Sequence, residues 1–592
     1  MANPHDARVH RDLVQADALR RGGRLPEAEK AVRAILRKEP RSPLAWLVLA
    51  KVHAARGEFA AAEQAYGRSI SIDADAFEAR VNLGVLLGQR GAAEEAAVQL
   101  RAALRNDPNH PLVLRNLGGV LRATGELDEA LQLLERSLAL DPNDAGVHSN
   151  LGLVCSSLGL HARALPHLER AVALAPAELS YYDNLLMLMH YSSERGRDTI
   201  FAAHRRYGEV AAQLAQPLPP QARRPLEGRK LRVGFVSADL RKHSVAFFLE
   251  PLLEHFDRER FELHAYSASR ASDEVTARLR PHFSTFTEAA GLDDDALAAQ
   301  LRRDALDVLV DLGGHTQGNR LGVFARRPTP VQLTYLGYPN TTGLASVDFR
   351  LTDAWADPGT ADDALHTERL LRLESGFLCY RPPAPSPDVV APPSTTGAPP
   401  TFGSFNALAK LSERTLALWS RLLAATPEAR LLLKESFLSH PATRRLVEQR
   451  LVAHGIALDR VVLLGHVAAL DGHLAAYGQV DVALDSFPYH GTTTTCDALW
   501  MGVPVVTLAG DAHVSRVGVS LLSRLGLSEH IALSDDEYVQ KARELLRDTP
   551  RRVDLRASAR ERLLRSGITD GARVTRAFEA ALLAAFEASA AP

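Results

Sequence analysis

Residues 485–508 read DSFPYHGTTTTCDALWMGVPVVTL, a stretch that passes from a strand into a helix and back into a strand. The apolar run VDVALDS (480–486) comes first, a turn rich in Gly and Thr follows, and CDALWMG and PVVTL complete the unit. This order predicts a βαβ unit of a parallel sheet, with the helix beginning at the carboxyl end of the strand. Free N–H groups and the helix dipole favour an anion at such a helix start. The sequence therefore predicts an anion-binding turn.

The side chains of this turn supply further hydrogen-bond donors and one acidic group. Gly491 allows a ligand to approach the backbone closely, and Asp497 could accept a hydrogen bond from a ribose hydroxyl. An ordinary N-capped helix without a ligand is the alternative, but four threonines in a row are poor helix formers, which favours binding. The ligand-binding candidates are Gly491, Thr492, Thr493, Thr494, Thr495 and Asp497.

Apolar strands and helical stretches alternate on both sides of a Pro-rich break at 381–400. The clearest strands before and after the break are LRVGFVSAD (231–239), FELHAYSA (261–268), LDVLVDLGG (306–314), TFGSFN (401–406), RLLLKES (430–436) and RVVLLGHV (460–467). The break is too rich in Pro and small residues for a packed element and is predicted to be a linker. We expect two Rossmann-like lobes facing a cleft, residues 229–380 and residues 401–592.

The first third of the chain repeats itself every 34 residues. Glycines on this period are Gly23, Gly57, Gly91, Gly125 and Gly159, and alanines on it are Ala28, Ala62, Ala96, Ala130 and Ala164. A period of 34 is typical of the tetratricopeptide repeat, a pair of antiparallel helices. We predict an α-helical solenoid of five repeats over 9–178, with capping helices and a linker over 179–228.

One asparagine also recurs on this period, at one position of the first helix in the last three repeats and in the helical pattern that follows them. The first two repeats have Val14 and Val48 at this position. A carboxamide can both donate and accept hydrogen bonds, which suits it to gripping a peptide backbone without reading side chains. A polar helix face without a ligand is the alternative interpretation. The candidate acceptor-binding residues are Asn82, Asn116, Asn150 and Asn184.

Composition narrows the function classes. The formal net charge of −2 gives no electrostatic reason to expect a nucleic-acid partner. Three well-separated cysteines, Cys155, Cys379 and Cys496, suit neither a disulfide framework nor a zinc site. We see no secretory signal and no apolar run long enough to span a membrane, and therefore expect a cytoplasmic protein. The acidic run at 293–295 is interpreted as a helix start and not as a metal motif.

The motif at 485–508 resembles the O-linked N-acetylglucosamine transferase family, glycosyltransferase family 41. Its plant SPINDLY branch, associated with O-fucosylation, looks closest. Three further segments carry the resemblance: GFVSADLRKHSVAFFLEPLL (234–253), DLGGHTQGNRLGVFARRPTPVQLTYLGYPNTTGLASVDFRLTD (311–353) and TFGSFNALAKLSERTLALW (401–419). Together with the repeats, the resemblance covers nearly the whole chain. It implies a two-lobed GT-B fold, inversion at the sugar carbon, no cofactor and no metal requirement.

The resemblance also implies roles for single residues. His243 matches the first-lobe histidine proposed as catalytic, and Lys410 matches the lysine that meets the donor phosphates. His243 also follows a predicted strand at its carboxyl end, where such sheets place active sites, although a lone loop histidine is often only a surface residue. His315, in GGHT, is a second-rank candidate for an active-site loop. The residues that match the family's contacts to the nucleotide base are His473, Val467, Ala468 and Ala469.

Four positions depart from the pattern of the N-acetylglucosamine enzymes and agree better with the SPINDLY branch: Ala407, Leu470, Ala476 and Thr492. The resemblance implies transfer of N-acetylglucosamine from UDP-N-acetylglucosamine to Ser or Thr of protein acceptors held by the repeats. Transfer of fucose from GDP-fucose is the alternative, because the four departing positions match residues that contact the donor in the family, so the departures leave the identity of the donor open. A catalytically inactive repeat scaffold and an N-linked glycosyltransferase are further alternatives.

Overall fold

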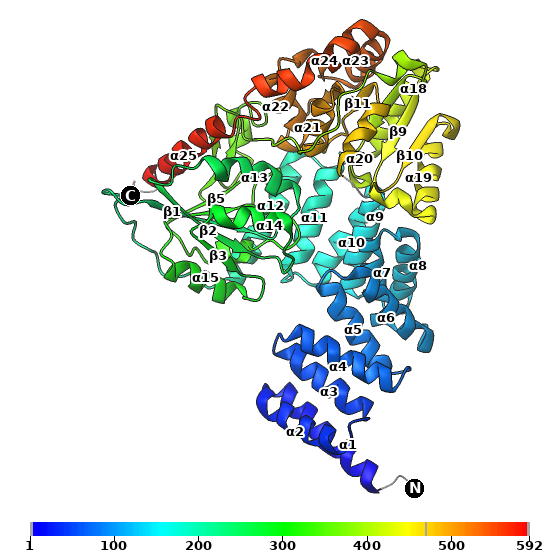
Figure 1. Ribbon diagram of the computed structural model, residues 1–592, viewed down its shortest axis with the longest axis vertical. Coiled ribbons are helices and arrows are strands. Elements are labelled where there is room, and N and C mark those ends of the chain that lie inside the picture. The colour runs from blue at the N-terminus through cyan, green and yellow to red at the C-terminus, as the bar shows by residue number, and fades with distance from the viewer. Residues whose placement is uncertain (1–3, 468–469, 589–592) are drawn as a thin grey trace. The chain divides into compact units, whose positions relative to one another are not determined.

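The computed structural model describes residues 4–467 and 470–588 (Figure 1). Its internal contacts divide the chain into two compact units, Met1–Val154 and Cys155–Pro592. The division falls inside a helix of the predicted fifth repeat, so the second helix of that repeat belongs to the larger unit.

The smaller unit consists of antiparallel helix pairs, as the 34-residue period predicts (Figure 1, blue). Its helices are α1 (Pro4–Arg21), α2 (Leu25–Lys38), α3 (Pro43–Ala55), α4 (Phe59–Ile72), α5 (Phe77–Gln89), α6 (Ala93–Asn106), α7 (Pro111–Thr124), α8 (Leu127–Leu140) and the start of α9 (Ala145–Ser157). The periodic glycines lie between the two helices of each pair, with φ between 73° and 87°. Only glycine adopts this left-handed conformation without strain, which explains its recurrence.

A glycine within the first helix of a pair also allows the two helices to approach closely. A Cβ added at Gly118 of α7 would lie 2.5 Å from Cγ of Leu134 on α8. Any larger residue at position 118 would therefore push the two helices apart.

The larger unit begins with α10 (His161–Leu174), α11 (Leu179–Tyr191) and α12 (Arg197–Leu214), followed by a seven-stranded parallel sheet. Its strands are β1 (Leu231–Ser237), β2 (Phe261–Ser267), β3 (Thr285–Glu288), β4 (Val308–Asp311), β5 (Val331–Thr334), β6 (Phe349–Thr352) and β7 (Arg369–Arg372), in the order β3-β2-β1-β4-β5-β6-β7. Helices α13 (Ser244–His255), α14 (Glu274–Leu279), α15 (Asp294–Arg303), α16 (Leu321–Ala325) and α17 (Thr360–Asp363) connect them.

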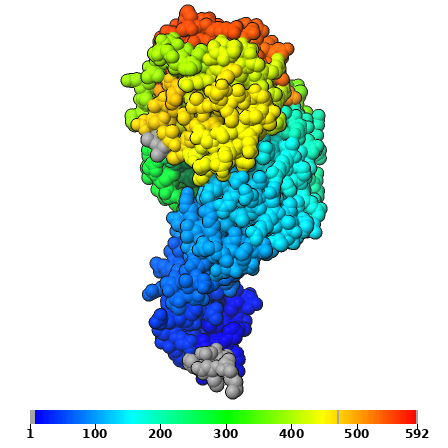
Figure 2. Space-filling view, turned by 90° about the vertical axis from the view of Figure 1, so that its right-hand side faces the viewer, coloured from blue at the N-terminus to red at the C-terminus, as the bar shows by residue number. Residues whose placement is uncertain are grey.

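A second parallel sheet follows, and it confirms the prediction of two Rossmann-like lobes. Its strands are β8 (Thr401–Ser404), β9 (Arg430–Lys434), β10 (Val461–Leu464), β11 (Val482–Leu484), β12 (Val505–Leu508) and β13 (Ile531–Ala532), in the order β10-β9-β8-β11-β12-β13. Its helices are α18 (Glu413–Ala425), α19 (Pro441–Ala453), α20 (Leu470–Ala475), α21 (Thr493–Trp500), α22 (Val517–Arg524), α23 (Asp535–Arg547), α24 (Thr549–Arg565) and α25 (Gly571–Ala588). Figure 2 shows α19 (yellow) on the face of this lobe toward the viewer, with α24 (orange-red) at its upper end.

Some short strands were not predicted, because polar residues interrupt their apolar pattern. Gln332 in β5 is fully buried, and its amide donates to the carbonyls of Phe324 and Ser346. Arg350 in β6 is buried beside Asp357. Buried polar groups with such partners are tolerated, but the partners lie 7 to 14 residues away, outside the strand, and cannot be read from the strand's own pattern.

The Pro-rich segment 381–400 is more ordered than predicted. It contains a 3-10 turn, Pro393–Thr396, and Ser394 Oγ donates to Asp481 Oδ1 over 2.6 Å. The prediction that no element of this segment is packed is therefore wrong, because side chains of the second lobe supply the partners that its prolines cannot.

The last helix leaves the second lobe and packs on the first, so the lobe expected over 401–592 does not keep its C-terminal helix. Figure 1 shows α25 (red) beside α13, and Thr575 Oγ1 donates to the carbonyl of Leu252 on α13. The ring of Phe578 contacts the rings of Phe235, Phe256 and Tyr335 in the core of the first lobe. Among the described residues, no helix is both long and apolar enough to cross a membrane.

We expect Phe578→Ala to lower the free energy of unfolding by about 3–5 kcal/mol, because the change leaves a cavity among aromatic side chains. Leu564→Ala is the matched control, since Leu564 on α24 is 55% exposed and should change stability by less than about 0.5 kcal/mol. Urea denaturation of both variants checks this. Equal effects would mean that α25 contributes nothing specific to the first lobe.

Candidate active site

A cleft of about 380 Å³ lies within the larger unit, lined by both lobes and by α11. It brings together predicted residues that are far apart in sequence: His243 before α13, Lys410 in the 3-10 turn Leu408–Lys410, and Thr492, Thr493 and Thr494 at the start of α21. Their neighbours in the sequence, Gly491, Thr495 and Asp497, do not line the cleft.

The threonine stretch is helical and not a turn, which corrects the prediction. Helix α21 begins at Thr493, so the free N–H groups of its first turn lie at the cleft. Thr494 Oγ1 donates to Asn406 Oδ1 over 2.8 Å, and Thr495 Oγ1 donates to the carbonyl of Gly491 over 2.9 Å. These side-chain bonds hold the first turn in place and offset the low helix propensity of threonine.

Gly491 is required by close packing. A Cβ at this position would lie 2.3 Å from Thr494 Oγ1 and 2.8 Å from Asn406 Oδ1. The N–H of Gly491 donates to Asp485 Oδ1 over 2.7 Å, at the end of β11. The glycine therefore fixes the path from strand to helix, which is a structural role beside the predicted ligand contact.

Lys410 is poised next to this helix start. Its Nζ donates to the carbonyl of His490 over 2.9 Å and lies 4.3 Å from the ring centre of Tyr489. Burial lowers the pKa of Lys410 to about 8, and the carboxylate of Asp485 partly opposes this shift. A cation with few fixed partners beside a helix N-terminus forms a positive site that suits a diphosphate.

The turn that carries Lys410 is held by α10, the last repeat helix. His161 Nε2 donates to the carbonyl of Ala409 over 2.8 Å, and burial lowers the pKa of His161 to about 4, so its ring is neutral at pH 7. Arg450 donates to the carbonyls of Leu411 and Leu158, and so joins the same two segments. Lys410 is thereby positioned from the repeat side as well as from its own lobe.

His243 caps helix α13 and reaches the cleft with a side chain that is 40% exposed. Its Nδ1 accepts a hydrogen bond from the N–H of Val245 over 3.3 Å and lies 3.5 Å from Asp239 Oδ2. Burial lowers the pKa of His243, whereas Asp239 raises it and Arg241 lowers it further. Because Nδ1 accepts, the proton of the neutral ring is on Nε2.

The predicted base-site residues form a separate cluster in the second lobe. His473 Nδ1 accepts from Lys434 Nζ over 2.7 Å, and its Nε2 lies 3.7 Å from Asp497 Oδ2. The carboxylate of Asp497 is buried and accepts from Tyr380 over 2.6 Å, so its predicted ribose contact would compete with a protein partner. Val467 follows β10, and Ala468 and Ala469 lie outside the described residues.

His315 does not face the cleft, and its second-rank prediction as an active-site residue is wrong. The residue is 2% exposed, and its two ring nitrogens meet Asp183 Oδ1 at 2.7 Å and the carbonyl of Thr342 at 3.0 Å. It fastens α11 to the first lobe, while its neighbour Thr316 lines the cleft.

The cleft residues that the sequence did not single out include Asn406, Tyr489 and His513. Asn406 and His513 follow β8 and β12. Their place beyond the carboxyl end of a strand is the signal that could have found them.

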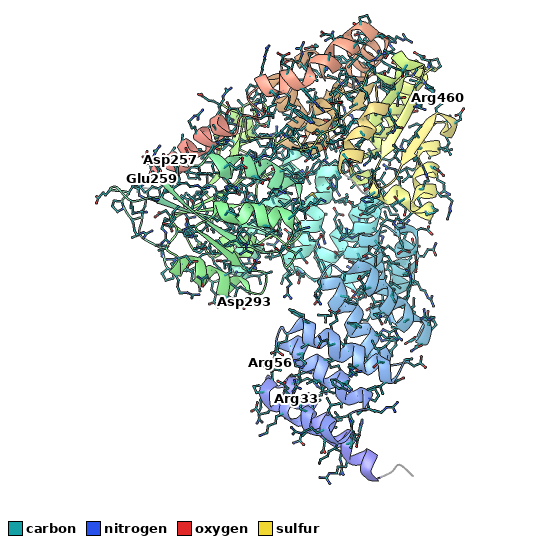
Figure 3. All side chains as sticks on the ribbon, viewed as in Figure 1. Arg33, Arg56, Asp257, Glu259, Asp293 and Arg460 are labelled. Carbon is teal, nitrogen blue, oxygen red and sulfur yellow. The ribbon has the colours of Figure 1, made fainter. Side chains whose placement is uncertain are left out.

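The acidic run at 293–295 starts α15, at the edge of the first lobe (Figure 3). Asp293 Oδ1 accepts from the N–H of Ala296, and Asp294 and Asp295 pair with Arg320 and Arg326. Within residues 4–467 and 470–588, no group of three His, Cys, Asp or Glu side chains is arranged to hold a metal ion.

The recurring asparagines occupy equivalent places on α5, α7, α9 and α11, and each is half-buried. Asn150 Nδ2 donates to the carbonyl of Arg115 over 3.3 Å, so at least one amide also links neighbouring repeats. Their role toward an acceptor stays a prediction.

The sequence profile described as Glycosyl transferase family 41 matches residues 189–379 and 398–577. The chain belongs to glycosyltransferase family 41. Tetratricopeptide-repeat profiles match residues 13–79 and 109–177 of this family member.

The names of similar proteins agree with this family assignment. The chain is 39% identical over 398 residues to a protein of Solanum lycopersicum named probable UDP-N-acetylglucosamine–peptide N-acetylglucosaminyltransferase SPINDLY, covering 67% of this chain and 43% of that protein. It is 28% identical to an Arabidopsis thaliana protein that has the same enzyme name with the suffix SEC. This match covers 55% of this chain and 34% of that protein. The chain thus spans about two fifths of the length of its SPINDLY relatives.

A solved structure is similar over most of this family 41 chain. A mutant of the Thermobaculum terrenum O-GlcNAc transferase is 34% identical, with a TM-score of 0.82, covering 87% of this chain and 98% of that one.

We expect His161→Ala to lower kcat/KM of glycosyl transfer by about tenfold or more, equivalent to about 1.4 kcal/mol, because the turn carrying Lys410 loses its anchor. His161→Gln should retain more activity, since a side-chain amide can donate to the same carbonyl. Steady-state kinetics with a melting curve checks both variants. Wild-type rates for His161→Ala would exclude a positioning role.

The pKa of Lys410 predicts an alkaline limb in the pH profile. A lowered lysine pKa means that the ammonium is present below about pH 8 and is lost above it. We therefore expect kcat/KM, which reports the free enzyme, to fall as pH rises through about 8. Lys410→Arg should move this limb upward, because guanidinium stays charged. If the alkaline limb of the Lys410→Arg variant lies at the wild-type pH, the limb belongs to another titrating group.

Proposed function

We propose that this protein transfers N-acetylglucosamine from UDP-N-acetylglucosamine to serine or threonine hydroxyls of protein acceptors, with inversion at the sugar carbon. The observation that carries the proposal is the placing of Lys410 and the N-terminus of α21 in one cleft with His243. The names of the SPINDLY, SEC and Thermobaculum relatives support the same reaction.

The chemistry follows from where charge develops. The acceptor hydroxyl attacks the anomeric carbon while the bond from that carbon to the diphosphate oxygen breaks. Negative charge grows on the leaving nucleoside diphosphate, and the Lys410 ammonium and the N–H groups at Thr493 and Thr494 would stabilise it. These groups supply the positive field that a metal ion supplies in other transferases, so we propose a reaction without metal or other cofactor.

Transfer of fucose from GDP-fucose is the second candidate. Ala407 and Thr492 both line the cleft, at positions where the N-acetylglucosamine enzymes are expected to have larger polar side chains. A smaller, less polar wall there suits a sugar without the N-acetyl group. An inactive scaffold is less well supported, since His243 and Lys410 both line the cleft.

The donor decides between the two candidates. The enzyme is incubated separately with UDP-N-acetylglucosamine and with GDP-fucose, with a Ser/Thr-rich protein acceptor and with EDTA in a parallel sample. Nucleotide release and the mass of the modified acceptor are measured. We expect N-acetylglucosamine addition that EDTA does not stop; fucose addition would select the second candidate, and no transfer from either donor would overturn the proposal.

The recurring asparagines give a prediction for the acceptor. Changing Asn116, Asn150 and Asn184 together to Ala should weaken protein acceptors and leave donor hydrolysis nearly unchanged, because these amides lie outside the cleft. Each amide lost should cost about 0.5–1.5 kcal/mol of acceptor binding. The measurement is the acceptor KM, beside the rate of donor hydrolysis.

Asn109→Ala is the control for this prediction, because Asn109 lies between α6 and α7 and bonds to Arg136. A melting curve of the triple variant shows whether the loss of the hydrogen bond between Asn150 and Arg115 lowers the stability of the protein. Wild-type transfer at subsaturating acceptor would mean that the asparagines are a solvated face.

A further inference from the structure

A buried histidine–carboxylate pair joins the two lobes at the cleft. His513 follows β12 in the second lobe, Asp357 follows β6 in the first, and Nδ1 of the histidine lies 2.7 Å from Oδ2 of the aspartate. The two residues are 6% and 1% exposed. Thr352 donates to the same carboxylate oxygen, and Arg350 lies 3.2 Å from it.

The pair fixes the state of the imidazole. Burial alone would raise the pKa of Asp357, but His513, Arg350 and Thr352 together hold it well below its usual range, so the carboxylate is ionised. An ionised carboxylate only accepts hydrogen bonds, so Nδ1 of His513 carries a proton and donates it to Asp357, and Nε2 is the nitrogen of this ring that can offer a lone pair.

That second nitrogen is open to a ligand. Within the described part of the chain, no hydrogen bond reaches Nε2 of His513, and it is not among the fully enclosed atoms that lack a partner. His513 lines the cleft that holds Lys410 and His243, and it also lines a neighbouring pocket of about 250 Å³.

The two cleft histidines are therefore in opposite states. His243 accepts a hydrogen bond at Nδ1 from a backbone N–H, so its neutral ring presents a proton at Nε2. His513 donates at Nδ1 to a carboxylate and presents a lone pair at Nε2. A group that removes a proton needs the lone pair, and an adjacent carboxylate stabilises the charge that forms on the ring.

We propose that His513, oriented by Asp357, is the general base that takes the proton of the acceptor hydroxyl, while His243 acts as a hydrogen-bond donor in the same cleft. This inference rests on the proposed transfer reaction and assigns its base. Because Asp357 and His513 belong to different lobes, the base is oriented only while the lobes are in contact.

The step balances without a further reagent. The acceptor oxygen forms its bond to the anomeric carbon and gives its proton to Nε2 of His513. The bond from the anomeric carbon to the diphosphate breaks, and the leaving oxygen keeps the electron pair. The imidazolium then returns the proton to water. Asp357 and Arg350 lie at the ring, and the same pocket is also lined by the charged or titratable residues Asp511, His190, His366, Arg195, Arg197 and Arg414. The cleft adds His243 and Lys410.

The test compares His513→Ala with Asp357→Asn, His243→Ala and a matched control. His530→Gln is the control, since His530 is a buried histidine of the same lobe that does not line the cleft. For each variant we measure kcat of transfer over pH 5–10, Kd of UDP and GDP, and rescue by added imidazole.

We expect His513→Ala to lower transfer kcat by roughly 10²–10⁴-fold, the usual contribution of a general base, with nucleotide Kd within about twofold of wild type. Added imidazole should restore part of the rate, and the acidic limb of the profile should disappear. Asp357→Asn should lower kcat by at least about tenfold, because the amide cannot stabilise the charged ring. His530→Gln should match wild type.

Four results would overturn the inference. The first is wild-type transfer by His513→Ala, and the second is a rate for His530→Gln as low as that for His513→Ala. The third is an acidic limb that disappears only in His243→Ala. The fourth is a parallel loss of nucleotide binding and transfer rate without imidazole rescue, which would mean that the pair only holds the lobes in contact. A wild-type enzyme that transfers neither sugar overturns the proposed function and this inference together. An active wild type with unaffected variants overturns the inference alone.

Discussion

The direction of the strands is the constraint on which the site depends. Both sheets are parallel, so each has all its carboxyl ends at one edge, and the cleft residues of the lobes follow those ends. His243 follows β1, Lys410 follows β8, and Thr492 follows β11. No short local motif could bring these three residues together, whereas two parallel sheets facing each other do so as a consequence of their hydrogen bonding.

The electrostatics of the cleft follow from this arrangement. A helix start and a lysine that is mostly withdrawn from water give a positive site. Withdrawing the ammonium costs free energy, which appears as the lowered pKa, and an arriving diphosphate would recover it. Two histidines with opposite hydrogen bonds at Nδ1 complete the cleft: His243 accepts from a backbone N–H, and His513 donates to a carboxylate.

Part of the last repeat contacts the turn that carries Lys410. The turn with Gly159 and the side chain of His161 lie against the 3-10 turn that carries Lys410. A Cβ at Gly159 would lie 2.8 Å from the carbonyl of Leu408, so glycine is needed there for close packing as well as for its φ of 73°. The turn with Gly159 and helix α10 thus take part in shaping the site.

The sequence alone determined the repeats, the two-lobed fold and the passage from β11 into a helix, because each follows from local periodicity or from an order of strand and helix within about 25 residues. Two residues that it singled out, His243 and Lys410, line the cleft, and their roles there stay predictions. The burial of His315 against Asp183, the return of α25 to the first lobe and the pairing of His513 with Asp357 were decided only by the tertiary structure. Their partners are 132, 323 and 156 residues apart in the chain, and a hydrogen bond between such distant residues leaves no periodic trace in either local sequence.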